Sequence, residues 1–294
     1  MISLIVATLG RIAELDRFLA SLDEQSYREQ NYRDFEVLVV DQNPDDRLLP
    51  VLALHPTLTL QHLRSERGLS RARNVGLRAA RGSIIAVPDD DCWYPKDLLA
   101  EVAAWFESHA EVGVLFTTLR TADNLHSGPR TPAAAQRCSK SDLSTCLSAS
   151  AALFMRGTVA AVVGEFNEYL GIGANSKYQA GEERDYVLRA LEKGFEFWYE
   201  PSFTVHHPSF GSAERLKRTT YTYALSEGCV QRLYHYPLSK VSGDLIRSFG
   251  GAAVRLCQCD WFNASVYLLR GAGQLRGYIS GPRDLSRLAG SRGH

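Results

Sequence analysis

Residues 83–95, SIIAVPDDDCWYP, carry the strongest indication of the fold, because an apolar run stops at Pro88 and passes directly into Asp89, Asp90 and Asp91. The run predicts a buried strand, since β-branched residues favour strands and proline ends them. Ligands of open α/β sheets bind at the carboxyl ends of strands, so we expect the acids at a ligand-binding edge. Adjacent carboxylates repel one another unless water or a cation compensates, and Mg²⁺ or Mn²⁺ takes such oxygen ligands. An acidic turn before a helix starting at Pro95 is the alternative.

The segments around this stretch alternate between short apolar runs and helical periodicity, which is typical of βαβ units around a mainly parallel sheet. We expect a long polar loop over 121–140 and only helices after residue 214. Strands are expected at 2–8, 35–41, 58–63, 83–87, 112–119, 147–155 and 195–206, and helices at 12–24, 69–80, 95–108, 182–193, 215–233 and 239–269.

The composition is that of an ordinary globular protein, with 294 residues, 45% of them hydrophobic. This excludes a disordered chain and a small disulfide scaffold. The 33 basic and 33 acidic side chains give no net charge, so nucleic acid is not an expected partner. The charge is divided unevenly: residues 1–213 hold 21 basic and 28 acidic side chains, and residues 214–294 hold 12 and 5.

The cysteines and the apolar segments indicate a cytoplasmic protein. The six cysteines contain no Cys-x-x-Cys pair and are expected to be reduced thiols. Residues 1–9 are apolar but meet Arg11, Glu14 and Asp16, so they predict a first strand rather than a signal peptide. No stretch approaches the ~18 to 20 uncharged apolar residues that a membrane-spanning helix needs.

Three further polar features are each ambiguous when taken alone. The segment GEERD at 181–185 opens a helix, where the helix dipole favours acids, so it is either a structural start or a source of a catalytic base. Asp41 ends a strand, where it caps a turn or binds a base or ribose. The segment RGLSRARN at 67–74 places three guanidinium groups around a helix start, which suits a diphosphate.

The order of these segments resembles that of the inverting, nucleotide-sugar-dependent family 2 glycosyltransferases. The resemblance covers about residues 1–210. It rests on IVATLGR at 5–11, VVD at 39–41, GLSRARNVG at 68–76, DDDCWYP at 89–95, which is similar to the DxD metal-binding motif, and GEERD at 181–185 with Arg189.

The resemblance implies a GT-A fold, a Rossmann-like, mostly parallel mixed sheet flanked by helices. The glycosyltransferase domain would be residues 1–212, and residues 213–294 a basic amphipathic helical extension. That extension mixes apolar and arginine side chains, which suits an anionic membrane surface, contacts with the acceptor, or a cover for the domain or another subunit.

The resemblance also implies roles for individual residues. Glu183 is the expected base that removes the acceptor proton, with Glu182 and Asp185 sharing another side of the helix. Asp90, Asp91 and His207 are the expected ligands of Mn²⁺ or Mg²⁺. Pro88 stands where many members have an additional acid, which leaves the choice among the three aspartates open by one position. The expected donor-binding residues are Thr8, Arg11, Asp41, Arg71, Arg73, Asn74 and Asp89.

The implied function is metal-dependent transfer of a sugar, from a donor expected to be a UDP-sugar, to a glycan or lipid-linked hydroxyl during polysaccharide biosynthesis. Such an enzyme would be cytoplasmic or peripheral on the inner membrane face. One alternative is an inactive regulator that binds a nucleotide-sugar or glycan. The other is a nucleotidyltransferase, which the first loop disfavours because it holds only Gly10 and Arg11 in place of a glycine-rich basic segment.

Overall fold

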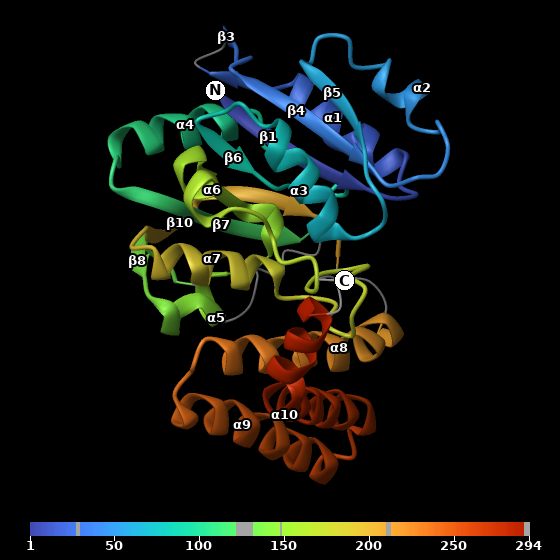
Figure 1. The fold of residues 1–294 in the computed structure, drawn as a ribbon, viewed down its shortest axis with the longest axis vertical. Coiled ribbons are helices and arrows are strands. Elements are labelled where there is room, and N and C mark those ends of the chain that lie inside the picture. Colours follow the sequence, from blue (N-terminus) through green and yellow to red (C-terminus); the bar gives the residue numbers. More distant parts are fainter. Residues whose placement is uncertain (28–29, 122–131, 148, 210–212, 291–294) are drawn as a thin grey trace. The chain divides into compact units, whose positions relative to one another are not determined.

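The computed structural model describes residues 1–27, 30–121, 132–147, 149–209 and 213–290 (Figure 1). The chain divides into two compact units. Unit 1 is Met1–Phe166 with Tyr186–Ser209, and unit 2 is Asn167–Asp185 with Phe210–His294. Segment 167–185, which we expected in the first domain, therefore packs with unit 2. A functional division at residue 212 stays a prediction.

Unit 1 is built on an eight-stranded mixed sheet. Its strands are β1 (Ile2–Thr8), β4 (Phe35–Asp41), β5 (Leu60–Arg64), β6 (Ile84–Ala86), β7 (Val112–Thr121), β8 (Gln136–Cys138), β9 (Leu153–Arg156) and β10 (Glu196–His207), and β2 (Ser26–Tyr27) pairs separately with β3 (Gln30–Asn31). The order is β5-β4-β1-β6-β9-β7-β10-β8. Strands β5, β4, β1 and β6 are parallel, as are β7 and β10, whereas β9 and β8 are antiparallel to their neighbours. The expected mostly parallel mixed sheet is confirmed.

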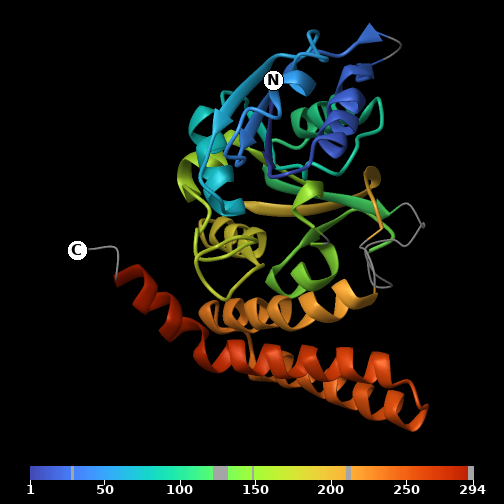
Figure 2. The ribbon, with the colours of Figure 1, turned by 90° about the vertical axis from the view of Figure 1, so that its right-hand side faces the viewer.

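Helices cover both faces of this sheet (Figure 2). They are α1 (Ala13–Asp23), α2 (Leu49–Leu52), α3 (Leu69–Ala79), α4 (Leu98–Ser108), α5 (Leu143–Cys146), α6 (Gly157–Val163) and α7 (Glu182–Glu192), whose first residues belong to unit 2. On one face, α1 and α4 bury Phe18 and Leu99 against Leu4 of β1. On the other face, α3 lies so close that a Cβ on Gly76 would be 2.2 Å from Ile5 Cγ2. The alternation of β1 side chains thus positions a helix on each side.

Two expectations near residues 121–155 are wrong in detail. Within the expected loop, residues 122–131 lie outside the described part, and Gln136–Cys138 forms β8 against the edge of β10, with Cys138 opposite Phe197. The expected strand at 147–155 is shorter, because Ser150–Ala152 forms a 3₁₀ turn before β9. All six cysteines are free, as expected, and the Sγ atoms of Cys138 and Cys146 lie 2.7 Å apart.

Unit 2 contains α8 (Ala213–Leu233), α9 (Leu238–Cys257) and α10 (Trp261–Gly290). The prediction of one helix over 239–269 is wrong, since the chain turns between α9 and α10. Cys259 takes a left-handed φ of 57°, which ends the helical path, and Asp260 then accepts a hydrogen bond from Asn263 N at 3.2 Å. A carboxylate that satisfies a free N–H group at a helix start favours a new helix there. The expected interruption at Tyr236 and Pro237 is confirmed.

Glycines bring α8 and α10 into backbone contact. Gly273, Gly277 and Gly281 lie four residues apart and hence on one side of α10. A Cβ on Gly277 would lie 1.9 Å from Leu225 O, and one on Gly273 would lie 2.5 Å from Tyr221 O. The contacting residues advance together along both helices, so α8 and α10 run parallel. Their contact leaves no room for a side chain at these positions.

Candidate functional site

The carboxyl ends of β1, β6 and β10 bring together the acidic segment and the two histidines that end β10, His206 and His207. Asp89 forms a parallel bridge with Ala7 just beyond β6. Trp93 forms an antiparallel bridge with His206, with backbone hydrogen bonds of 2.9 and 3.0 Å. These two attachments fix the intervening acids between β1 and β10.

Asp89, Asp91 and His207 form a cluster whose ligand atoms lie within 4.8 Å of one another. His207 Nε2 is 3.2 Å from Asp91 Oδ1. Burial alone would lower the pKa of His207, but Asp91 outweighs it and raises that pKa. Burial would likewise raise the pKa of Asp91, but His207 and Arg11 hold it below its ordinary value. Two of the three expected metal ligands, Asp91 and His207, are therefore adjacent. The third member of the cluster is Asp89, whereas Asp90 was expected.

Asp90 instead faces Arg11, which the sequence placed at the donor site. Arg11 Nη1 lies 2.7 Å from Asp90 Oδ1 and 2.5 Å from Asp91 Oδ2. Burial raises the pKa of Asp90 to about 6, against the opposing effects of Arg11 and Thr8. One guanidinium thus compensates two of the three adjacent carboxylates, which explains how the segment tolerates its own repulsion.

Arg73 approaches the cluster from α3 and is 1% exposed. Its Nη2 donates to Ser150 Oγ at 2.7 Å and lies 3.4 Å from Asp89 Oδ1. The sequence did not indicate Ser150, because the turn that presents it was expected to be strand. The other expected donor residues on α3 have different neighbours. Arg71 pairs with Glu66, and Asn74 exchanges hydrogen bonds of 2.7 and 3.0 Å with the Phe166 backbone.

A stacked arrangement supports the acidic segment from α1. The Trp93 ring stacks on His206 at 5.4 Å between centroids and 10° between planes, and the Arg17 guanidinium lies 4.6 Å from the Trp93 ring centroid. Arg17 Nη2 also donates to Asp91 O at 2.6 Å. Sequence reasoning missed Arg17, since a polar residue on an amphipathic helix gives no sign of a distant partner.

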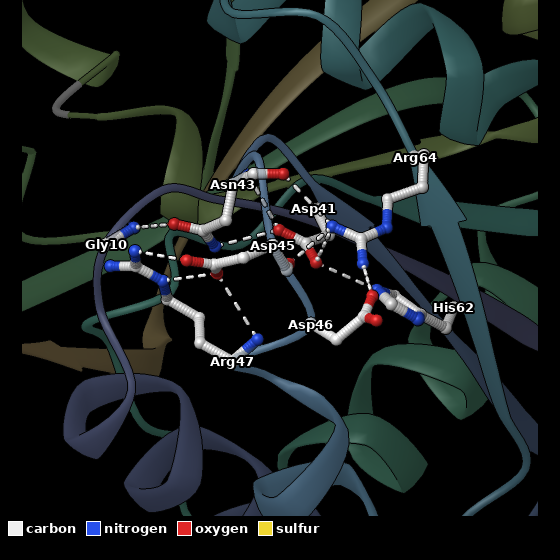
Figure 3. A network of polar contacts seen from close by, with 8 residues as sticks. All are labelled: Gly10, Asp41, Asn43, Asp45, Asp46, Arg47, His62 and Arg64. Atoms are coloured by element: carbon white, nitrogen blue, oxygen red, sulfur yellow. Dashed lines mark hydrogen bonds and ion pairs between the residues drawn. The ribbon is translucent and has the colours of Figure 1, made fainter.

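Asp41, at the end of β4, is fully buried in a network of polar contacts (Figure 3). Its Oδ1 accepts hydrogen bonds from Asn43 N and Nδ2, both at 2.8 Å. Its Oδ2 lies 3.0 Å from His62 Nε2 and 2.9 Å from Arg64 Nη1. Gly10 N donates to Asn43 Oδ1 at 2.8 Å, which joins the first loop to this strand end.

Arg64 is the most exposed of the residues that contact Asp41 directly. It also donates to the backbone oxygens of Asn43 and Asp45 at 3.0 and 2.8 Å, and it pairs with Asp46. Each oxygen of Asp41 therefore has two donors already. An incoming N–H donor must replace one of them, and Arg64, at 43% exposure of its side chain, is the partner with most room to move.

The expected catalytic acids open α7 and belong to unit 2. Asp185 is buried and accepts a hydrogen bond from the Tyr234 hydroxyl at 2.7 Å, which gives it a structural partner. Arg184 pairs with Glu227. Glu182 is buried, whereas Glu183 is partly exposed and forms no ion pair with any described residue. Glu183 is thus the acid of this segment with a carboxylate available to a ligand.

Comparison with known sequences identifies a family and distant relatives. The family described as "Glycosyl transferase family 2" matches residues 3–160, just over half of the chain. An uncharacterized glycosyltransferase of Haemophilus influenzae is 31% identical over 97 residues, 33% of this chain and 31% of that protein. The uncharacterized glycosyltransferase YwdF of Bacillus subtilis is 28% identical over 109 residues, 36% of this chain and 38% of that protein. The matches thus span only 31% and 38% of the lengths of these two relatives.

Solved structures share the fold across nearly the whole chain. S. aureus TarS 1-349 in complex with UDP-GlcNAc has a TM-score of 0.56 at 16% identity, covering 97% of this chain and 91% of that one. The mannosyltransferase PcManGT from Pyrobaculum calidifontis, in complex with GDP-Man and Mn²⁺, has a TM-score of 0.61 at 17% identity, covering 96% and 87%. At such identities the likeness establishes the fold alone.

Proposed function

Because this chain belongs to glycosyl transferase family 2, we propose that it transfers a sugar from a nucleotide donor to a hydroxyl acceptor with inversion at the anomeric carbon. The observation that carries the proposal is the joining of Asp89, Asp91 and His207 at the strand edge, beside the guanidinium groups of Arg11 and Arg73. Carboxylates, an imidazole and guanidinium groups suit a diphosphate and a divalent ion together.

The nucleoside is proposed to bind at Asp41. A pyrimidine or purine ring N–H would donate to its carboxylate as Arg64 moves aside, and Gly10 would lie near the base through its contact with Asn43. Thr8 and Arg11 would follow towards the phosphates. Arg71, which pairs with Glu66 here, is proposed to bind a phosphate of the donor instead. Asn74 is proposed to support the donor site by fixing the backbone at Phe166 against α3. UDP is the proposed nucleotide.

The residues proposed to hold Mn²⁺ or Mg²⁺ are Asp91 and His207, with Asp89 as the third ligand in place of Asp90. They fit such an ion because their ligand atoms converge within 4.8 Å and because carboxylate and imidazole groups suit manganese. A divalent ion there supplies neutralisation of the charge that develops on the leaving diphosphate. Arg73, held by Ser150, directs its positive charge to the same place.

Glu183 is proposed as the base that takes the proton of the acceptor hydroxyl while that oxygen attacks the anomeric carbon. Asp185, held by Tyr234, and the buried Glu182 fix the start of α7 from which Glu183 projects. The proposed acceptor is a glycan or lipid-linked hydroxyl in polysaccharide assembly, and the proposed location is the cytoplasm or the inner face of its membrane. The inactive regulator remains the second candidate, distinguished below by turnover.

The test measures nucleotide release from UDP-, GDP- and dTDP-sugars with manganese, magnesium or chelator. We expect slow, metal-dependent hydrolysis of one donor. Asp91→Asn should abolish it, whereas Asp34→Asn should leave it unchanged, because Asp34 pairs with the Met1 amino group away from the site. Metal-independent release that survives Asp91→Asn would exclude the proposed metal site.

A second comparison separates an enzyme from a binding protein. Glu183→Gln should keep the affinity for UDP with manganese, measured by calorimetry, and lose turnover. Glu192→Gln, at the exposed end of the same helix, is the matched control. Binding without turnover in the native chain, over the full donor panel and with glycan acceptors, would favour the regulator.

A further inference from the structure

Helix α9 exposes large apolar side chains away from its buried side. Its buried side carries Val241, Ser248 and Ala252, which are 4% exposed or less. Ile246 and Phe249, on another side, are 70% and 40% exposed. Ile246 and Phe249 are three residues apart and therefore adjacent on the helix surface.

Helix α10 presents a similar stripe. Trp261, Leu268 and Leu275 recur every seven residues, and Ile279 follows Leu275 by four, so all four lie on one side of the helix. Their exposed fractions run from 40% to 69%. The glycines that contact α8 occupy a different side of α10. The exposed stripe is thus not needed for the packing of the unit.

The two stripes join through one contact. A Cβ on Gly271 of α10 would lie 2.8 Å from the Phe249 ring of α9, so this ring lies directly against α10. Leu268 and Leu275 lie three residues before and four residues after Gly271, so they neighbour it on the surface of α10. We call the surface made by Ile246, Phe249, Trp261, Leu268, Leu275 and Ile279 the apolar strip. Contiguous exposed apolar surface of this kind marks an interaction site.

Positive charge borders the apolar strip. Arg247 follows Ile246, and Arg283 lies one turn beyond Ile279. The three acids of residues 238–285 already have basic partners: Asp244 with Lys240 at 2.7 Å and with Arg247 at 3.0 Å, Asp260 with Arg255 at 3.5 Å and Asp284 with Lys177 at 2.7 Å. Arg283 has no acidic partner among the described residues. Residues 238–285 hold six basic side chains against these three acids, so the field around the apolar strip is positive.

We propose that the apolar strip lies in the surface of a membrane containing anionic lipids, with the apolar side chains in the acyl boundary and the arginines at the phosphates. An exposed apolar stripe with tryptophan and flanking arginine is the pattern of helices that lie in the interfacial plane. No helix in the described part of the chain is long and apolar enough to span a bilayer. The proposal goes beyond the transfer reaction and names a lipid surface as partner of unit 2.

The same charges argue against a second copy of the chain as the occupant. A two-fold contact through the apolar strip would bring two surfaces of net positive charge together. The acids that would compensate them are already paired within the unit. Anionic headgroups supply the missing negative charge, so a lipid surface fits better.

The experiment is sedimentation of the full chain with vesicles of phosphatidylcholine alone or mixed with phosphatidylglycerol. The test variant is Ile246→Glu with Trp261→Glu, both at exposed positions, so folding is retained. Leu54→Glu and Ile172→Glu are matched controls, because these side chains are 68% and 56% exposed and lie outside the apolar strip. Arg283→Gln tests the charge.

We expect binding to the mixed vesicles only, weakened at least about tenfold by the double substitution, which removes apolar area from the acyl boundary. The controls should bind like the native chain. Arg283→Gln and a rise in salt from ~0.1 to ~1 M, which shortens the Debye length from about 10 to 3 Å, should both weaken binding. Hydrolysis of a soluble donor should be unchanged in the double variant. A failure of the membrane proposal can therefore be told apart from a failure of the proposed transfer reaction.

Three results would overturn the proposal. One is equal binding to both vesicle types. Another is an equal loss in the Leu54→Glu or Ile172→Glu control. The third is a concentration-dependent dimer in light scattering that disappears with Ile246→Glu, which would assign the apolar strip to a second copy.

Discussion

Gly277→Ala should destabilise unit 2 even though alanine is the better helix former. In an exposed helix interior this substitution stabilises by roughly 0.5–1 kcal/mol. At Gly277, however, the new Cβ would lie 1.9 Å from Leu225 O. A backbone oxygen within a helix cannot rotate away, so α8 and α10 would have to separate by about 1 Å or more. Overpacking of this kind costs about 1–3 kcal/mol, so after the gain in helix propensity we expect a net loss of about 1–2 kcal/mol.

The assay is amide hydrogen exchange of the full chain, read by mass spectrometry on peptides from α8 and α10. Exchange there should accelerate by roughly tenfold, since 1.4 kcal/mol corresponds to a factor of ten. Peptides from β1 and β4 of unit 1 are the internal reference. Gly250→Ala is the matched control, because Gly250 on α9 has nothing within 4 Å of its added Cβ. That control should slow exchange slightly.

The reasoning is refuted if Gly277→Ala and Gly250→Ala change exchange in the same direction. It is also refuted if the α8 and α10 peptides of Gly277→Ala exchange as slowly as those of the native chain. Either result would mean that the two helices tolerate separation and that the glycines do not set their distance.

Three further predictions concern single contacts. Ser150→Ala should lower the calorimetric affinity for UDP with manganese several-fold, because Arg73 loses its 2.7 Å acceptor. Ser141→Ala should not, because the Ser141 hydroxyl contacts the Ser139 hydroxyl instead. Burial would raise the pKa of Asp244, but Lys240 outweighs it and lowers that pKa. The ionised Asp244 therefore stabilises the fold fully above the ordinary pKa of about 4, and this stabilisation is lost as the pH falls further. In urea unfolding followed against pH, Asp244→Asn should lessen the loss of stability at low pH. Diamide should join Cys138 to Cys146 before it oxidises Cys229, and peptide mapping with the opposite order would contradict their 2.7 Å contact.

Much of the sheet follows from local sequence. Strands β1 and β4 begin and end where their apolar runs begin and end, because both are central and buried on both faces. β8 was not predictable in this way, since three residues of mixed character become a strand only where β10 offers a free edge. The turn between α9 and α10 was missed because Gln258, Cys259 and Asp260 include neither glycine nor proline.

The sequence predicted which side chains meet at the strand edge better than it predicted their contacts, and their roles stay a prediction. The acids, Arg11, Arg73 and His207 were all identified by motif, but Asp89 rather than Asp90 adjoins Asp91 and His207. That choice depends on the bridges from Ala7 to Asp89 and from Trp93 to His206, which join segments far apart in the chain. Arg17 and Ser150 enter through the same long-range pairing, and no local pattern announces either.

The four tryptophans give the protein two separate built-in optical probes. Trp93 contacts both the Arg17 guanidinium and the His206 ring. It follows Asp91 by two residues and pairs with the residue before His207, so its emission should respond to any ion or nucleotide that changes those charges. Trp261 is 69% exposed at the start of α10, so its emission should shift to the blue when lipid replaces water. Trp105 and Trp198 contact each other at 6.4 Å within unit 1 and supply a constant background. Replacing either Trp93 or Trp261 by phenylalanine would leave a protein whose fluorescence follows one event alone, without any attached dye.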